Sequence, residues 1–162
     1  FGIHIMLAFR KTEILRLQIV DYDFKNWTIL IPDSKSKNHQ TNLINIHSSF
    51  RKYFEVIDWT KYPKDHYVFH SGGQPSKEQQ TNRDYYTDKF SKVRQHFGFS
   101  SHHTLYGLKH TMMCHLAEQG MELRKLMTYG RFNSVDALQQ YLKHYLNRPL
   151  EDLSNTIDKL LG

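Results

Sequence analysis

The sequence has little cysteine, proline or glycine, and each shortage excludes a class of protein. Cys114 is its one cysteine, which excludes an internal disulfide and a zinc site built on cysteine pairs. Four prolines and eight glycines in 162 residues exclude collagen-like and low-complexity chains. No apolar run approaches the roughly 20 residues that span a bilayer, so we expect a soluble domain.

What the sequence has is the material for a core and a surplus of positive charge. Hydrophobic residues make up 39% and aromatic residues 14%, which is enough for one globular domain over residues 1–162. The 22 Lys and Arg against 16 Asp and Glu give a net charge of +6. Such a surplus fits a polyanionic partner such as nucleic acid, but many basic proteins bind none, so charge alone leaves the question open.

The first half reads as a short broken helix followed by a hairpin. Residues 3–17 have a helical pattern with a break near Phe9–Lys11, and residues 21–23 are typical of a turn. Strands are predicted at 27–31 and 43–46, around a polar, basic turn at 33–38. A short helix over 48–56, a short strand over 67–69 and a loop over 71–75 complete this half.

The second half is predicted to be helical. Thr81 or Asn82 opens a helix that runs to Phe97 and stops at Gly98, and Thr104 caps the next helix, which ends at Gly120. That helix has an apolar stripe of Leu105, Leu108, Met112 and Leu116. Further helices are predicted over 121–129, 134–146 and 150–161. The fold class is therefore mainly α with a small antiparallel β-hairpin or sheet (α+β).

Several possible sites lack the required pattern. Eleven histidines suggest metal binding, but His66 and His70 lie in a predicted strand, and His110 and His115 diverge on a helix, so we expect no metal site. Gly72-Gly73 lacks the Lys-Ser/Thr of a phosphate-binding loop. The sequence therefore predicts neither a metal site nor a phosphate-binding loop of this type.

Three separated segments, by contrast, match the boxes of one enzyme family. Residues 7–17, LAFRKTEILRL, followed by 21–23, resemble G-x-R-x-x-E-(aliphatic)-x-x-L…D. Residues 104–111, TLYGLKHT, align with T-x-H-x-L-R-H-T, and residues 131–142 resemble R/G-H-S-S-(aliphatic)…T-x-x-Y. Their order and intervals, with a basic hairpin after the first box, are similar to the catalytic domain of the tyrosine recombinases, the phage integrase family. The resemblance extends from about residue 7 to the last predicted helix.

This resemblance implies DNA strand cleavage and rejoining. In the family, a tyrosine hydroxyl attacks a DNA phosphodiester, forms a 3′-phosphotyrosyl link and releases a 5′-hydroxyl, and another 5′-hydroxyl reverses the step. Cationic donors stabilise the charge that develops on the phosphate, and a hairpin lysine protonates the leaving oxygen. No metal and no cofactor is required.

Matched by position, Arg10 corresponds to the first phosphate-binding arginine and Tyr141 to the nucleophile. Tyr145 is a rival for the nucleophile. The hairpin lysine is Lys35 or Lys37, depending on where a one-residue difference in loop length falls.

Three of the six catalytic positions depart from the family pattern. Tyr106 and Lys109 stand where the second box has His and Arg, and Phe132 stands where the third has His or Trp. Lysine keeps the charge but loses the planar fork of arginine, and phenylalanine donates no hydrogen bond. His110 and Arg131 are nearby candidates to compensate. The sequence leaves open an active recombinase, an inactive relative that binds DNA or a partner recombinase, and an unrelated basic helical module.

We expect duplex DNA to be contacted mainly through its phosphates. The candidate contacts are Lys11, Arg83, His110 and Arg131, together with the Lys and Arg residues of 35–52, 83–94 and 109–148. The apolar stripe of 150–161 either packs on its own domain or docks on a neighbouring recombinase protomer. Because residue 1 is Phe, we interpret the chain as the catalytic half of a longer, DNA-associated cytoplasmic protein of a bacterium, phage or other mobile element, with its core-binding domain upstream.

Overall fold

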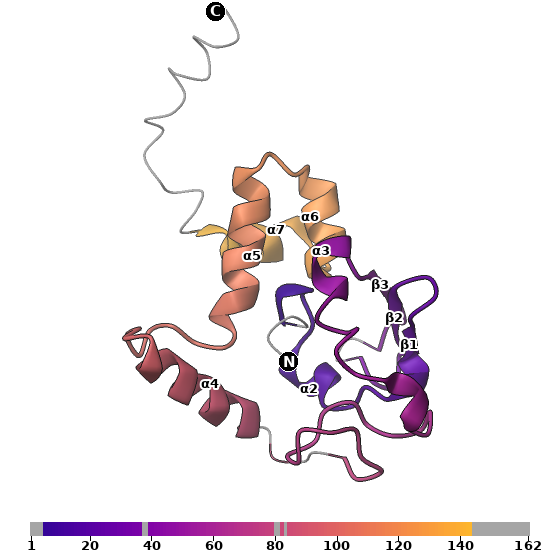
Figure 1. The fold of residues 1–162 in the computed structure, drawn as a ribbon. Coiled ribbons are helices and arrows are strands. Elements are labelled where there is room, and N and C mark those ends of the chain that lie inside the picture. The colour runs from indigo at the N-terminus through magenta and orange to yellow at the C-terminus, as the bar shows by residue number, and fades with distance from the viewer. Residues whose placement is uncertain (1–4, 37–38, 80–81, 83, 144–162) are drawn as a thin grey trace, which may run out of the picture. The chain divides into compact units, whose positions relative to one another are not determined.

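A computed structural model describes residues 5–36, 39–79, 82 and 84–143 (Figure 1). These residues group into two compact units, which divide after Lys109. The first unit contains the sheet with α2, α3 and α4, and the second contains α6, α7 and most of α5. Among the described residues, no helix combines the length and the apolar character needed to cross a membrane.

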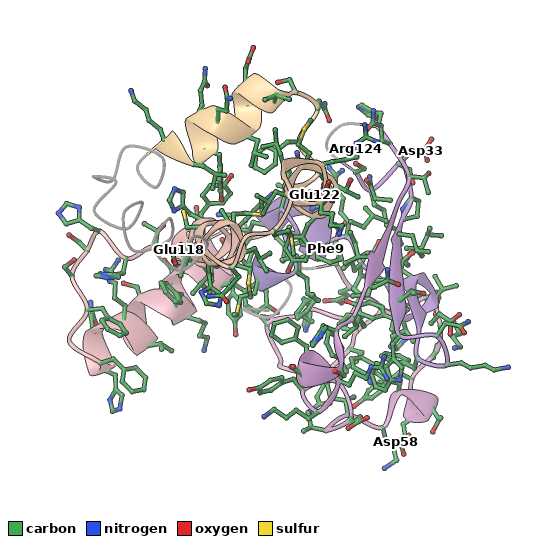
Figure 2. The ribbon with its side chains drawn as sticks, turned by 90° about the horizontal axis from the view of Figure 1, so that it is seen from above. Phe9, Asp33, Asp58, Glu118, Glu122 and Arg124 are labelled. Atoms are coloured by element: carbon green, nitrogen blue, oxygen red, sulfur yellow. The ribbon has the colours of Figure 1, made fainter. Side chains whose placement is uncertain are left out.

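The chain enters the first unit through the predicted broken helix. Residues 5 and 6 are helical, the helix breaks before Arg10, and α2 (Lys11–Ile14) is a single turn. Ala8 lies in the break with a φ of 65°, a left-handed conformation that a residue with a Cβ adopts at a cost. Phe9 (labelled in Figure 2) and Ile14, on either side of Arg10, are fully buried, so this segment is anchored in the core.

The predicted hairpin is present and belongs to a sheet of three antiparallel strands in the order β1-β2-β3. β2 (Thr28–Ile31) pairs with β3 (Asn42–Asn45), and Ile29 lies opposite Ile44. β2 alternates between buried and exposed residues, as a strand with one covered face should. β1 (Tyr22–Asp23) pairs with β2, so the turn predicted at 21–23 is wrong for these two residues.

Aromatic packing explains the additional strand. The Tyr22 ring stacks on Phe24 and Trp59 at centroid distances of 5.6 and 6.1 Å, and the Trp59 indole N–H donates to the Phe54 carbonyl. This burial favours an extended Tyr22 over the local turn preference of its Asp neighbours. The stack joins β1 to the short 3-10 helix η2 (Trp59–Lys61), and another 3-10 helix, η1 (Ile19–Asp21), directly precedes β1.

Two other predictions for the first unit are corrected. The helix predicted over 48–56 stops early, because α3 covers Ser48–Arg51 and turns follow it. The strand predicted over 67–69 is reduced to isolated bridges from Tyr67 to Gln18 and Ser76. α4 (Tyr85–His96) starts after Asp84 and stops before Gly98, which has a φ of 69°, so its predicted stop is confirmed.

The helices of the second half occur near their predicted positions. α5 (Gly107–Glu118) begins where the Gly107 N–H donates to Thr104 Oγ1 at 3.0 Å. α6 (Leu123–Gly130) and α7 (Val135–Tyr141) follow, and Ser134 caps α7. Met113 is fully buried and packs with Leu126, Leu138 and Leu142 in the core of the second unit, whereas Met112, predicted in the apolar stripe, is half-buried. The predicted helix over 150–161 lies outside the described residues.

Candidate active site

Arg10 is held by a buried carboxylate. Its backbone N–H donates to Glu13 Oε2 at 2.8 Å, and its Nη1 donates to Glu13 Oε1 at 3.1 Å. The Glu13 side chain is completely buried, while that of Arg10 is 25% exposed. Glu13 thus fixes one edge of the guanidinium, and in the described part of the chain no other hydrogen bond engages its remaining N–H groups. The three-residue spacing of R-x-x-E in the first box thus corresponds to a direct contact between the two side chains.

Lys109 lies in the same unit, on the first turn of α5, and is only 3% exposed. Its Nζ donates to the Ala8 carbonyl oxygen at 3.1 Å. Ala8 is the left-handed residue two positions before Arg10. The lysine at the second arginine position therefore braces the backbone that presents Arg10.

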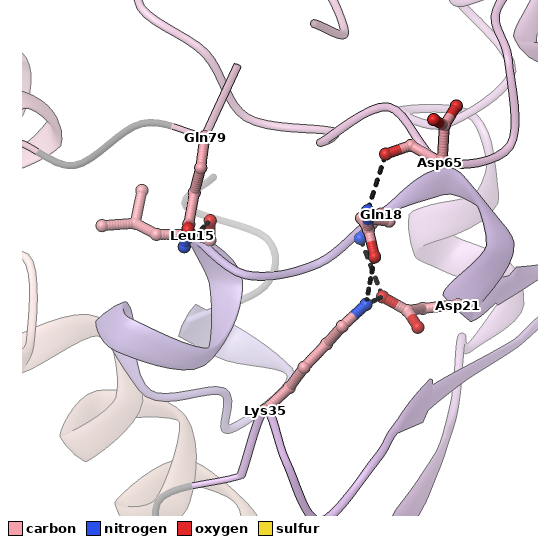
Figure 3. Close-up of polar contacts among 6 residues, drawn as sticks. All are labelled: Leu15, Gln18, Asp21, Lys35, Asp65 and Gln79. Carbon is pink, nitrogen blue, oxygen red and sulfur yellow. Dashed lines mark hydrogen bonds and ion pairs between the residues drawn. The ribbon is translucent and has the colours of Figure 1, made fainter. Parts of the chain in front are cut away.

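Lys35 is the hairpin lysine that the structure describes, since Lys37 lies outside the described residues. Its Nζ donates to Asp21 Oδ2 at 2.6 Å and to Gln18 Oε1 at 2.9 Å (Figure 3). The side chains of Lys35 and Asp21 are 17% and 5% exposed, so the ion pair is largely shielded from water. Asp21 also caps η1, because the Gln18 N–H donates to its Oδ2 at 2.7 Å.

Tyr141, at the end of α7 in the second unit, is packed between two rings. Its ring centroid lies 5.0 Å from that of His110 and 5.1 Å from that of Phe132, and its hydroxyl oxygen is buried. The His110 Nδ1 is 3.5 Å from the Cys114 sulfur. Phe132 and His110, an altered position and a proposed compensating residue, therefore both contact the predicted nucleophile.

The turn between α6 and α7 determines where Phe132 lies. Arg131 caps α6 with a left-handed φ of 55° and is 8% exposed. A Cβ on Gly130 would overlap the Phe132 ring and come within 3.0 Å of Met113 Cε. Glycine is required here because the aromatic ring folds back over the helix end.

The remaining predicted positions are dispersed. Tyr106 precedes α5 and is 56% exposed. Lys11 Nζ pairs with Asp84 Oδ1 at 3.0 Å, and Arg83 lies outside the described residues. No group of three or more His, Cys, Asp or Glu side chains in the described part of the chain is placed to hold a metal ion.

Sequence reasoning did not identify Gln18 and Asp21 as partners of Lys35. The sequence predicts Asp21 as part of the turn at 21–23 and as the aspartate that closes the first box. The spacing between Gln18 and Asp21 indicates the capping role of Asp21, since an acidic residue three positions after the cap residue is typical of a capped helix start.

The family follows from a comparison with known proteins. A sequence model of the phage integrase family matches residues 2–148. The chain belongs to the phage integrase family. The recognition made from the three boxes is thereby confirmed.

One curated integrase-family relative and two solved structures illustrate the similarity. The chain is 27% identical over 145 residues to a probable integrase/recombinase of Acholeplasma phage L2, covering 88% of this chain and 47% of that protein. The Tn1549 transposon integrase in complex with transposon right end DNA matches with a TM-score of 0.70 at 13% identity, over 99% of this chain and 58% of that one. XerH site-specific recombinase bound to a palindromic difH substrate matches with a TM-score of 0.67 at 18% identity, over 97% of this chain and 44% of that one. The chain thus has the fold of these integrases and spans about half their length.

Proposed function

We propose that this chain is the strand-cleaving part of a site-specific DNA recombinase. Duplex DNA is its substrate, and its reaction passes through a 3′-phosphotyrosyl intermediate. The observation that carries the proposal is the arrangement of Arg10, whose Nη1 donates to buried Glu13 while, among the described residues, no hydrogen bond engages its other guanidinium N–H groups. A planar fork fixed on one side is suited to bind a phosphate on the other.

In the proposed reaction, the Tyr141 hydroxyl gives up its proton to solvent as its oxygen attacks the phosphorus, and the bond between phosphorus and the 5′ oxygen breaks. Lys35 donates a proton to the leaving 5′ oxygen, and Arg10 stabilises the charge on the non-bridging oxygens. The 5′-hydroxyl of a second strand then attacks the phosphotyrosine and restores a phosphodiester. Because one phosphodiester replaces another, the exchange needs no external energy source.

The altered positions predict a slow enzyme. Lys109 is buried against the Ala8 carbonyl, so it supports the Arg10 segment in place of a second guanidinium fork. Phe132 supplies packing for Tyr141 and no hydrogen bond. Removing one donor to a developing oxyanion typically costs about 10²–10³ in rate, so we expect cleavage well below that of a recombinase with an unaltered site.

The test is covalent capture. The full-length protein is incubated with a randomised pool of nicked duplex oligonucleotides, in which cleavage releases a short fragment and traps the adduct. We expect an adduct that survives detergent, is lost in Tyr141→Phe and persists in the matched control Tyr85→Phe, whose hydroxyl donates to the Ser71 carbonyl. If Tyr145→Phe abolishes the adduct while Tyr141→Phe keeps it, the assignment of the nucleophile is wrong.

The altered site also supports a second candidate function. Lys109, Phe132 and the exposed Tyr106 together favour a relative that binds DNA or a recombinase protomer without cutting. In that case the wild-type protein would retain salt-dependent affinity for duplex DNA and form no adduct with any member of the pool. Docking of residues 150–161 on a neighbouring protomer stays a prediction for either function.

A further inference from the structure

We propose that Asp21 is a positioning residue for proton transfer by Lys35. This inference rests on the proposed function, in which Lys35 protonates the leaving oxygen. Its basis is the short, shielded contact between Asp21 Oδ2 and Lys35 Nζ, together with the Gln18 side chain that shares the same ammonium (Figure 3).

Both ends of the Lys35 side chain are fixed. At its base, the Lys35 N–H donates to the Pro32 carbonyl at 3.0 Å within the turn that follows β2. At its tip, Asp21 and Gln18 accept two of the three N–H bonds of the ammonium. In the described part of the chain the third has no acceptor, and it is the one left for a leaving oxygen.

Asp21 is itself held from several sides. Its Oδ2 accepts from the Gln18 N–H, and its own N–H donates to the Gln18 carbonyl at 3.0 Å. Gln18 Nε2 in turn donates to the Asp65 carbonyl at 2.6 Å, which ties the network to a distant loop. A flexible lysine is therefore converted into a donor of defined position, which is what a proton transfer in a transition state requires.

The proposed step balances. In cleavage the Tyr141 hydroxyl gives its proton to solvent as its oxygen bonds to phosphorus. As the bond between phosphorus and the 5′ oxygen breaks, the third N–H proton of Lys35 passes to that oxygen, leaving a neutral amine between Asp21 and Gln18. In the rejoining step this amine takes the proton of the attacking 5′-hydroxyl and becomes an ammonium again, and the departing Tyr141 oxygen takes a proton from solvent. Asp21 never touches the DNA and acts only through Lys35.

A sulfur substitution tests this directly. When the bridging 5′ oxygen of the captured duplex is replaced by sulfur, the leaving group is a thiolate, which departs without a proton. On the oxygen substrate we expect Lys35→Met to lower the single-turnover cleavage rate by about 10²–10⁴ and Asp21→Asn by about 10-fold or more. On the sulfur substrate both variants should approach the wild-type rate.

A matched control separates positioning from general damage. Asp58→Asn removes the carboxylate of an exposed pair with Lys61, at 3.4 Å, and should leave both rates unchanged (Figure 2). Should Asp21→Asn fold poorly, Gln18→Met removes the other acceptor, and we expect a smaller loss that sulfur also restores.

Three results would overturn the inference. The first is that Asp21→Asn cleaves the oxygen substrate as fast as Asp58→Asn does. The second is that Asp21→Asn slows cleavage of the oxygen and sulfur substrates equally. The third is that Lys35→Met cleaves the oxygen substrate at the wild-type rate. Failure of the proposed function is a different result, in which the wild-type protein forms no adduct on either substrate.

Discussion

The candidate active-site side chains of the two units have different kinds of neighbours. In the first unit, Arg10, Lys35 and Lys109 each donate to an oxygen at 2.6–3.1 Å, and the acceptors on Glu13, Asp21 and Ala8 are all buried. In the second unit, Tyr141 lies between the rings of His110 and Phe132 at about 5 Å.

The hydrogen bonds of the first unit fix the positions of its cationic groups. A charge-assisted hydrogen bond fixes both distance and direction, whereas a ring contact contributes about 0.5–1.5 kcal/mol and tolerates a change of angle. We infer that the cationic groups are set before DNA binds. The first two predictions below test these two kinds of contact.

The largest expected effect is that of Arg10→Lys. A lysine cannot keep one donor on Glu13 and present two parallel donors to a phosphate, so we expect single-turnover cleavage to fall by about 10²–10³. The free energy of unfolding, from urea titration, should change by no more than about 1 kcal/mol, because the Arg10 side chain is partly solvated. The matched control is Arg16→Lys at an exposed position, and an equal loss there would remove the special role of Arg10.

The next effect concerns the packed tyrosine. Gly130→Ala forces the Phe132 ring to move, so we expect the free energy of unfolding to fall by about 1–3 kcal/mol and adduct formation to slow with it. Phe132→Leu in the same background should recover part of both losses, since the smaller side chain makes room.

A second glycine on a helix provides the control for this change. Gly107→Ala meets only Thr104 Oγ1 at 3.5 Å, an ordinary contact, and should be neutral or stabilising by up to about 1 kcal/mol. Additive losses from Gly130→Ala and Phe132→Leu would contradict the proposed steric coupling.

The smallest effect is a pH dependence. Burial raises the pKa of Tyr129 to about 12, above the value of about 10 expected for the unfolded chain. Its contribution to stability is therefore complete below pH 10 and is lost as the pH rises toward 12. We expect Tyr129→Phe to reduce the alkaline loss of unfolding free energy by about 1–2 kcal/mol, measured by urea titration at pH 8 and pH 11. An unchanged pH profile would show that other groups control alkaline unfolding.

Much of the fold could be predicted because its signals are local. Thr104 caps α5 through its own hydroxyl, and the left-handed Gly98 lies at the predicted stop of α4. The predictions are wrong where contacts with residues elsewhere in the fold determine the backbone conformation. Tyr22 becomes a strand because it stacks on Phe24 and Trp59, and Tyr67 forms single bridges to Gln18 and Ser76, neither of which belongs to a strand.

The contacts of the candidate site are likewise predictable where they are local and unpredictable where they are long-range. The three-residue spacing from Arg10 to Glu13 predicts their contact, since it places them on one turn of helix. The Lys35–Asp21 contact spans 14 residues and depends on how the hairpin folds back on η1, which no local pattern encodes. The assignment of Lys35 rather than Lys37 as the general acid stays a prediction, and the rate of Lys35→Met on the oxygen and sulfur substrates tests it.

The aromatic stack of the first unit has a practical consequence for watching the chain unfold. The sequence contains two tryptophans, Trp27 and Trp59, and both belong to the first unit. Trp59 is stacked on Phe24 at 5.0 Å and donates its indole N–H to a carbonyl, so its emission is sensitive to the integrity of that unit. Far-ultraviolet circular dichroism, in contrast, reports on the helices of both units. Comparing the two signals during one titration would therefore reveal whether the half that carries the arginine and the half that carries the tyrosine melt together or in turn.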